Sequence, residues 1–388
     1  MTHQQNFDQH LLPLWMDQQL QTPAFVYDQR EIQRRLDYFN IARNAGCKLL
    51  YSIKAVPLPS LVFLMQGYID GLSASSLFES RLAREMIGDS GTVHITTPGL
   101  GSKDIPELSG LCDYISFNSL SQWQRNKTVI EFVKTGLRIN PGLSFARDVR
   151  FDPCREGSKL GVTMDQVSSL PVESLNGISG LHIHTNCESE NYSELVQTVE
   201  ILLDKYPALL QQMSWLNLGG GYITDNEGQI GLLQELIRDL KTRYVQEVFI
   251  EPGKGIIGKS GYLVASVIDV FNSGSKKIAV VDSTINHLPE VFEYQYSPVI
   301  LDEDKHGAYE YRISGASCLS GDIFGDYRFH RELQPGNKLI FANVGAYMLV
   351  KANFFNGINL PNIYLLNLNG HLELIKQYDY SIYREFWR

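Results

Sequence analysis

The stretch KLLYSIK, residues 48–54, decides the fold because a short apolar run ends directly at a lysine. Similar runs recur through residue 250, at 91–96, 114–117, 136–139, 180–183, 215–218 and 247–250. Amphipathic stretches separate them, at 32–45, 80–87, 121–133, 193–205 and 231–244. This alternation of strands and helices is typical of a parallel sheet covered by helices. We therefore expect an α/β fold, a (β/α)8 TIM-like barrel whose chemistry lies at the carboxyl ends of its strands.

The pattern changes after about residue 261. Strand-like runs now follow one another with turn residues between them and little helical periodicity, at 262–271, 277–281, 309–314, 338–342 and 363–368. This succession predicts a C-terminal, mostly antiparallel β domain. We assign residues 25–260 to the barrel. Residues 1–24 and 261–388 are assigned to a β-sandwich or β-barrel-like domain, joined by the N-terminal segment.

The overall composition argues against several classes of protein. The 34 basic and 43 acidic residues give a net charge of −9, whereas a nucleic-acid partner requires clustered Lys and Arg. Five scattered cysteines without a C-x-x-C pair predict free thiols in a reducing compartment and no metal site. The N-terminus lacks an apolar signal stretch, and no run approaches ~18 apolar residues. We expect a cytoplasmic enzyme that binds neither membrane nor nucleic acid.

Residues that could take part in catalysis or binding follow three of the predicted strands. Desolvation at a strand end would lower the pKa of Lys54 and make its amine nucleophilic toward an aldehyde, although most such lysines are solvated loop residues. Gly219-Gly220-Gly221 would let backbone amides approach an anion, or would form a plain turn. Glu251, followed by Pro252-Gly253, could pair with a protonated ring nitrogen, or could cap a helix or form an ion pair.

Two further motifs allow more than one interpretation. His182 and His184 alternate on one strand and so point to the same face. One of them could stack on a planar cofactor while the other is a buried, hydrogen-bonded histidine; a metal site would need a third ligand cluster, which is missing. In Cys318-Leu319-Ser320-Gly321-Asp322, the thiol could transfer a proton and the acid could hold an amine. A small buried thiol and a turn aspartate are the ordinary alternative.

In their order along the chain, these motifs resemble the alanine-racemase-type barrel of pyridoxal 5'-phosphate (PLP) enzymes, in particular its basic amino-acid decarboxylases. The resemblance extends from TPAFVY, residues 22–27, to the last fifty residues, and includes SKLG at 158–161. It implies that Lys54 holds the cofactor, that His184 packs over the ring and that Glu251 faces the ring nitrogen. The implied cofactor-binding residues are Lys54, Arg138, His184, Gly219, Gly220, Gly221, Glu251, Gly253 and Tyr347.

Within that superfamily, the chain is similar to the carboxynorspermidine/carboxyspermidine decarboxylases. The stretches that carry this likeness are GLHIHTNCE at 180–188, NHLPEV at 286–291, CLSGD at 318–322 and NGINLP at 356–361. The resemblance implies a carboxy-lyase of polyamine biosynthesis acting on a small amino-acid substrate, with Lys54, His184 and Cys318 as catalytic residues. It further implies a homodimer with shared active sites, in which Cys318 of the neighbouring subunit reprotonates the α-carbon. The implied substrate-binding residues are His287, Glu290, Glu293, Cys318 and Asp322.

Several alternatives stay open. Leu319 and Lys254 stand where diaminopimelate decarboxylases usually have Glu and Arg, which disfavours a diaminopimelate substrate. A carboxy-aminopropyl group on a peptide–nucleotide antibiotic precursor would require the same chemistry. A racemase of this fold places a tyrosine where Cys318 stands, and PLP-carrying homeostasis proteins lack the β domain. A purely structural barrel would not need the ordered motifs.

Overall fold

The computed structural model describes residues 8–388 except 131, 147 and 170–171. The chain divides into two compact units, Gln33–Ile256 and Met1–Ile32 together with Ile257–Arg388. We call them the barrel unit and the sheet unit. Residues 1–7 of the N-terminal segment and residue 131 of the expected helix 121–133 lie outside the described part. The domain boundaries expected at 24/25 and 260/261 stay a prediction.

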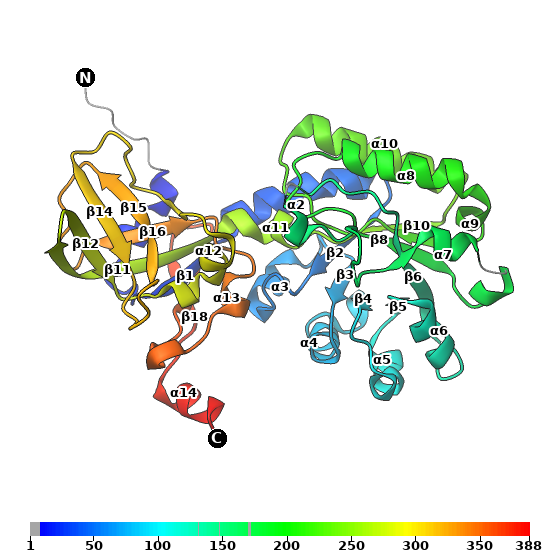
Figure 1. The fold of residues 1–388 in the computed structure, drawn as a ribbon, viewed down its shortest axis with the longest axis horizontal. Helices are drawn as coiled ribbons and strands as arrows, with labels where there is room; N and C mark the ends of the chain where they lie inside the picture. The colour runs from blue at the N-terminus through cyan, green and yellow to red at the C-terminus, as the bar shows by residue number, and fades with distance from the viewer. Residues whose placement is uncertain (1–7, 131, 147, 170–171) are drawn as a thin grey trace. The chain divides into compact units, whose positions relative to one another are not determined.

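In the described part of the barrel unit, eight parallel strands close on themselves through the pairing of β5 with β6 (Figure 1). The strands are β2 Lys48–Ser52, β3 Gly71–Ala74, β4 Thr92–Thr97, β5 Tyr114–Phe117, β6 Lys134–Asn140, β8 Gly180–Ile183, β9 Trp215–Asn217 and β10 Glu247–Ile250, with β7 Val162–Thr163 added beside β6. The predicted barrel is thus confirmed. Strand β3 was not predicted because its sequence, GLSA, lacks an apolar run.

Helices surround the barrel strands (Figure 1). They are α2 Gln29–Asn44, α3 Pro59–Met65, α4 Leu77–Ile87, α5 Ile105–Leu111, α6 Leu120–Asn126, α7 Met164–Ser168, α8 Ser193–Lys205, α9 Pro207–Gln211, α10 Glu227–Arg243 and α11 Lys254–Ile257. Helix α6 is shorter than the expected 121–133. At its end the Asn126 side-chain amide donates to the Gln122 carbonyl at 2.7 Å, and such local side-chain bonds disfavour continuation of a helix.

The barrel interior is filled by large side chains rather than being an open pore. Leu50, Tyr114, Trp215 and Phe249 form one buried cluster. A Cβ atom added at Gly180 would lie 2.0 Å from the Trp215 ring, so the strand needs glycine there to admit the indole. This packing closes the interior and directs any chemistry to the strand ends.

The sheet unit is mostly antiparallel, as predicted. Its strands are β1 Ala24–Asp28, β11 Gly261–Ser273, β12 Lys276–Val281, β13 Val299–Ile300, β14 Tyr309–Ser314, β15 Ile323–Phe329, β16 Lys338–Ala342, β17 Asn362–Leu366 and β18 Leu372–Lys376. The order is β15-β14-β12-β11-β1-β17-β18, with β16 on β11 and β13 on β16; β1–β17 and β12–β14 are the parallel pairs. Its helices are α1 Pro13–Met16, α12 Pro289–Tyr294, α13 Met348–Lys351 and α14 Tyr380–Phe386.

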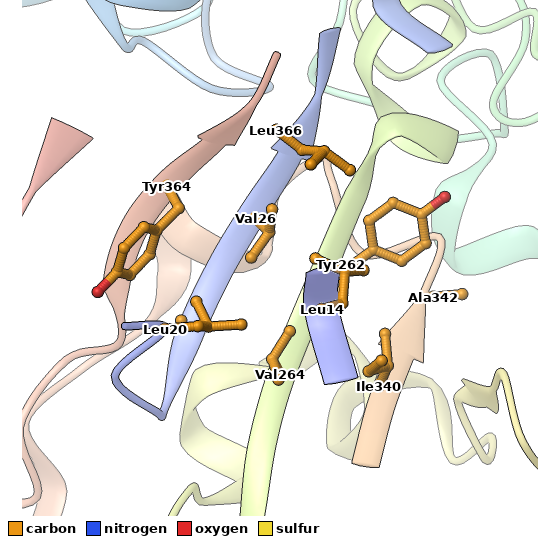
Figure 2. Packing of buried hydrophobic residues seen from close by; sticks show 10 residues of the cluster. Leu14, Leu20, Val26, Tyr262, Val264, Ile340, Ala342, Tyr364 and Leu366 are labelled. Atoms are coloured by element: carbon orange, nitrogen blue, oxygen red, sulfur yellow. The ribbon is translucent and has the colours of Figure 1, made fainter. Parts of the chain in front are cut away.

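Strand β1 lies inside the sheet unit because it pairs with β11 on one side and β17 on the other. Figure 2 shows Leu14 of α1 over Val26, Val264 and Ile340, which come from three neighbouring strands. Burying each such aliphatic side chain contributes roughly 1.5–3 kcal/mol.

None of the helices described here is long and apolar enough to cross a membrane.

Candidate active site

Lys54 follows the carboxyl end of β2, where two backbone hydrogen bonds hold the chain. The Ser52 amide donates to the Pro252 carbonyl at 3.2 Å, and the Ile53 amide donates to the Ser73 carbonyl at 3.1 Å. The Lys54 side chain reaches solvent, yet the surrounding protein displaces enough water to lower its pKa. Its pKa is lowered mainly by this desolvation, and further by Arg138, against the opposing effect of nearby carboxylates. Lys54 is therefore an accessible amine whose pKa is lower than that of an ordinary lysine.

Glu251 follows β10 and is only 7% exposed. Its Oε1 accepts a hydrogen bond from the Asn217 amide at 2.6 Å, and its Oε2 lies 3.3 Å from His182 Nε2. Burial raises the pKa of this carboxyl, but the two partners outweigh burial and hold the pKa below its usual range. Glu251 is thus an ionised carboxylate held in one orientation.

His182 and His184 point to the same face, as their spacing predicted. Their ring centroids are 6.3 Å apart and the planes differ by 19°. Burial lowers the pKa of both rings. Nδ1 of His184 accepts a hydrogen bond from the Gly220 amide at 3.2 Å, which assigns the proton of this neutral ring to Nε2. His182 is bonded to Glu251, while its Nδ1 has no partner in the described part of the chain.

The three glycines after β9 are each required by a different backbone contact. An added Cβ at Gly219 would lie 2.4 Å from the Ile183 carbonyl oxygen, at Gly220 2.4 Å from that of Glu251, and at Gly221 2.1 Å from that of Asn186. Gly219 and Gly221 also have φ values of +70° and +92°. The triplet therefore lets the chain pass between the loops that carry His184 and Glu251.

Positively polarised groups accompany this arrangement. Among the described residues, the amides of Gly221 and Gly253 donate no hydrogen bond to the protein. The side chain of Arg138, on β6, is 8% exposed and likewise makes no hydrogen bond or ion pair within the described ranges. Burial lowers the pKa of its guanidinium. These groups could bind an anion.

The remaining predicted site residues lie in the sheet unit. Cys318 is an exposed free thiol in the loop between β14 and β15. Asp322, at the end of that loop, is buried, and its carboxylate accepts hydrogen bonds from the Ile285 amide and from Ser317. Tyr347 is the N-cap residue that precedes α13, and its backbone is in the left-handed region, at φ +67°.

Three predicted substrate-binding residues lie within residues 287–293, and their surroundings differ. His287 is fully buried, its Nδ1 lies 3.0 Å from the Ser283 hydroxyl, and burial lowers its pKa to about 3. Glu290 is buried and Glu293 exposed; both form ion pairs with Lys351, at 3.1 and 2.7 Å. No group of three metal-ligating side chains occurs in the described part of the chain.

Sequence reasoning missed two partners of the predicted residues. Asn217 orients Glu251, and its position within strand β9 resembled ordinary strand residues. Glu79, near the start of α4, accepts the Ser75 amide at 2.6 Å and acts electrostatically on Lys54; burial raises its pKa. The S-x-x-E pattern of Ser76 and Glu79 was available as a helix-capping signal.

Comparison with known proteins places this arrangement in context. Residues 24–345 match the family described as pyridoxal-dependent decarboxylase, C-terminal sheet domain. The carboxynorspermidine/carboxyspermidine decarboxylase of Herminiimonas arsenicoxydans is 32% identical over 367 residues, which cover 94% of this chain and 98% of that protein. The carboxyaminopropylagmatine decarboxylase of Synechocystis is 34% identical over 376 residues, covering 94% and 95%.

Solved structures give the same picture. The crystal structure of carboxynorspermidine decarboxylase complexed with norspermidine from Campylobacter jejuni matches with a TM-score of 0.86 at 28% identity, covering 95% of this chain and all of that one. Diaminopimelate decarboxylase from Helicobacter pylori complexed with L-lysine shares the fold, with a TM-score of 0.81 at 19% identity. The resemblance inferred from the motifs is confirmed.

Proposed function

Because the chain belongs to the pyridoxal-dependent decarboxylases, we propose that it removes the α-carboxylate of carboxynorspermidine or carboxyspermidine in polyamine biosynthesis. The observation that carries this proposal is the similarity, along 94% of the chain, to decarboxylases with that name. The likeness to a norspermidine-bound relative supports it, since norspermidine is what remains when carboxynorspermidine loses its carboxylate.

The residues of the barrel unit fit PLP. Lys54 supplies an accessible amine with a lowered pKa for the aldehyde, and Glu251 supplies an ionised carboxylate for the protonated ring nitrogen. The neutral ring of His184 offers a flat face for packing. The unpaired amides of Gly221 and Gly253 suit the phosphate, and the buried cation of Arg138 favours the anionic cofactor. We also assign Tyr347 of the sheet unit to the phosphate, on the resemblance alone.

These residues divide the work of decarboxylation. When bound, PLP supplies an electron sink for the pair left on the α-carbon as carbon dioxide departs. Glu251 keeps its negative charge opposite the ring nitrogen because Asn217 and His182 hold both its oxygens. His184 would cover one face of the cofactor ring and exclude water from it. Its Nδ1 stays bonded to the Gly220 amide. Lys54 would hold the cofactor through its amine, whose pKa is lowered by desolvation.

The α-carbon must regain a proton in place of the lost carboxylate, and we assign that proton to the Cys318 thiol. The proposed enzyme is a homodimer in which Cys318 acts in the neighbouring subunit's site. The exposure of this thiol supports the assignment, since a proton donor to another subunit must lie on the surface. In this proposal, Glu290 and Glu293 add negative charge near the substrate's amines, and His287 belongs to the same substrate-binding set.

A second candidate substrate is carboxyaminopropylagmatine. The Synechocystis decarboxylase named for it is as similar to this chain as the polyamine enzymes are. The two substrates share the carboxy-aminopropyl group and differ in whether an ammonium or a guanidinium ends the tail. The chemistry at Lys54 is the same for both.

The first experiment is an absorption spectrum followed by a carbon dioxide assay. We expect a visible band of lysine-bound PLP that Lys54→Ala removes, and release from carboxynorspermidine or carboxyspermidine but not from diaminopimelate, lysine or ornithine. Release from carboxyaminopropylagmatine alone would favour the second candidate. A band without release from any of these would point to a peptide–nucleotide substrate, and no band with added PLP would contradict the proposal.

The same assay tests Glu251, which follows β10, against a matched control at the start of that strand. Glu251→Gln removes the negative charge opposite the ring nitrogen, and we expect kcat to fall by roughly 10²–10³-fold. Glu247 lies at the opposite end of β10, where it is bonded to Lys48, Tyr114 and Lys134. Glu247→Gln should lower thermal stability with little effect on kcat. An unchanged kcat in Glu251→Gln would refute its role.

A further inference from the structure

The loop that carries Cys318 is built on a buried carboxylate. Asp322 is 3% exposed. Its Oδ1 accepts the Ile285 amide at 2.6 Å, and its Oδ2 accepts both the amide of Ser317, at 2.9 Å, and the Ser317 hydroxyl. Its own amide donates to the Leu319 carbonyl at 2.9 Å. Asp322 therefore ties both sides of the loop to the turn at residue 285.

Little of the Asp322 carboxylate is left for a ligand. A Cβ at Gly315 would lie 2.2 Å from Oδ1, so the loop backbone lies flat against the acid. A carboxylate accepts about four hydrogen bonds, and three are already made, two by Ser317 of the loop and one by the Ile285 amide. The remaining acceptor position belongs to a carboxylate that is 3% exposed and covered by the loop backbone, so a substrate ammonium has little room to reach it. This arrangement argues against direct binding of the substrate amine.

A second contact holds Cys318 itself. Its amide donates to Asn356 Oδ1 at 2.7 Å, and Asn356 adopts φ +58°, a conformation that asparagine tolerates better than most residues. The next amide, of Leu319, donates to the Ser317 hydroxyl at 3.3 Å. The backbone is thus held before, at and after the exposed thiol, while the side chain keeps its rotation about a single bond.

We propose that Asp322 and Asn356 are positioning residues that direct the Cys318 thiol, and that Asp322 is not a ligand of the substrate amine. This inference rests on the proposed role of Cys318 as proton donor. Proton transfer depends steeply on placement, and a displacement of about 1 Å can lower a rate by 10²-fold. The substrate's distal amine therefore depends on other acids.

The test compares Asp322→Asn and Asn356→Ala with wild type and with Asp326→Asn, a control on β15 whose acid is exposed and ion-paired with Arg312. An asparagine side chain keeps one accepting oxygen, and its NH2 group would face a backbone amide that Asp322 accepts, so that amide loses its acceptor. We expect amide hydrogen exchange of residues 316–319 to rise by about ten-fold in Asp322→Asn, and less in Asn356→Ala, with the control unchanged. This measurement needs no turnover. Unchanged exchange in both variants would overturn the proposal.

Turnover then separates positioning from substrate binding. We expect kcat to fall on the order of 10- to 100-fold with KM nearly unchanged, and the C–D bond formed in D2O to lose stereochemical purity, as in Cys318→Ala. A rise in KM with unchanged kcat would instead make Asp322 a substrate ligand. Retained purity in Cys318→Ala would refute the proton-donor role, and with it the proposed direction of the thiol. Asn356→Ala keeps the test decisive if Asp322→Asn does not fold.

Discussion

At the scale of single residues, the desolvation that lowers the pKa of Lys54 also lowers the stability of the folded protein. Its pKa is lowered in the folded protein, mainly by desolvation, whereas the unfolded chain keeps an ordinary lysine pKa of about 10.4. Between the two values the unfolded chain binds one more proton, so stability rises with pH in that window. Below the pKa that Lys54 has in the folded protein, its full destabilising effect on the folded state is present. A bound cofactor would remove it by consuming the amine.

The prediction is that Lys54→Met makes the PLP-free protein more stable than wild type at neutral pH. The difference in the free energy of unfolding should shrink as the pH rises toward the ordinary lysine value. Urea titrations of the two proteins across that range measure it. Lys103→Met, at an exposed lysine of the barrel unit, is the control. Equal stability of Lys54→Met and wild type at every pH would contradict the assigned environment of Lys54.

At the scale of elements, the glycine triplet joins two loops that carry the site. The Ser189 amide donates to the Gly221 carbonyl at 2.8 Å, and the Glu251 amide donates to the Gly219 carbonyl at 2.7 Å. Hydrogen bonds therefore link the triplet to the loop after β8 on one side and to the loop after β10 on the other. The sequence predicted that these glycines expose backbone amides. That they also allow their backbone to lie against the carbonyls of neighbouring loops depends on which strands become neighbours.

The corresponding prediction concerns Gly221→Ala. The new methyl group would meet the Asn186 carbonyl at 2.1 Å, at a φ of +92°. We expect the free energy of unfolding to fall by roughly 1–3 kcal/mol, with a shift of His184 that weakens cofactor binding. Gly231→Ala, in α10 with no atom near its Cβ, should instead stabilise the protein by about 0.5–1 kcal/mol. Thermal unfolding of both variants tests the contrast; equal effects would contradict it.

At the scale of the whole molecule, the proposed dimer accounts for features of the sheet unit. The turn Phe355–Gly357, which binds the Cys318 amide through Asn356, is followed by β17, β18 and α14. Phe354, next to this turn, packs against Tyr383 and Phe386 of α14. Phe355, Tyr380, Phe386 and Trp387 remain exposed. Exposed aromatic groups close to the Cys318 loop favour an interface with a second copy.

The prediction is that two impaired variants restore activity when their subunits are mixed. Lys54→Ala and Cys318→Ala each damage one half of a shared site, so a mixed dimer keeps one intact site. Random exchange should recover about one quarter of the wild-type activity, because half of the dimers are mixed and each has one of two sites. Sedimentation equilibrium should give a dimer. Activity that stays at the level of the separate variants after subunit exchange would refute a shared site.

The amino-acid sequence by itself determined most strand positions of the barrel, β3 excepted, because an apolar run ended by polar residues is a local signal. It also determined the family through the order of Lys54, His184, Glu251 and Cys318. Only the tertiary structure decided the surroundings of these residues. Glu251 meets His182 69 positions away, and Asp322 meets Ile285 37 positions away. Barrel closure and loop packing create such pairs, and the local sequence around either partner carries no signal for them.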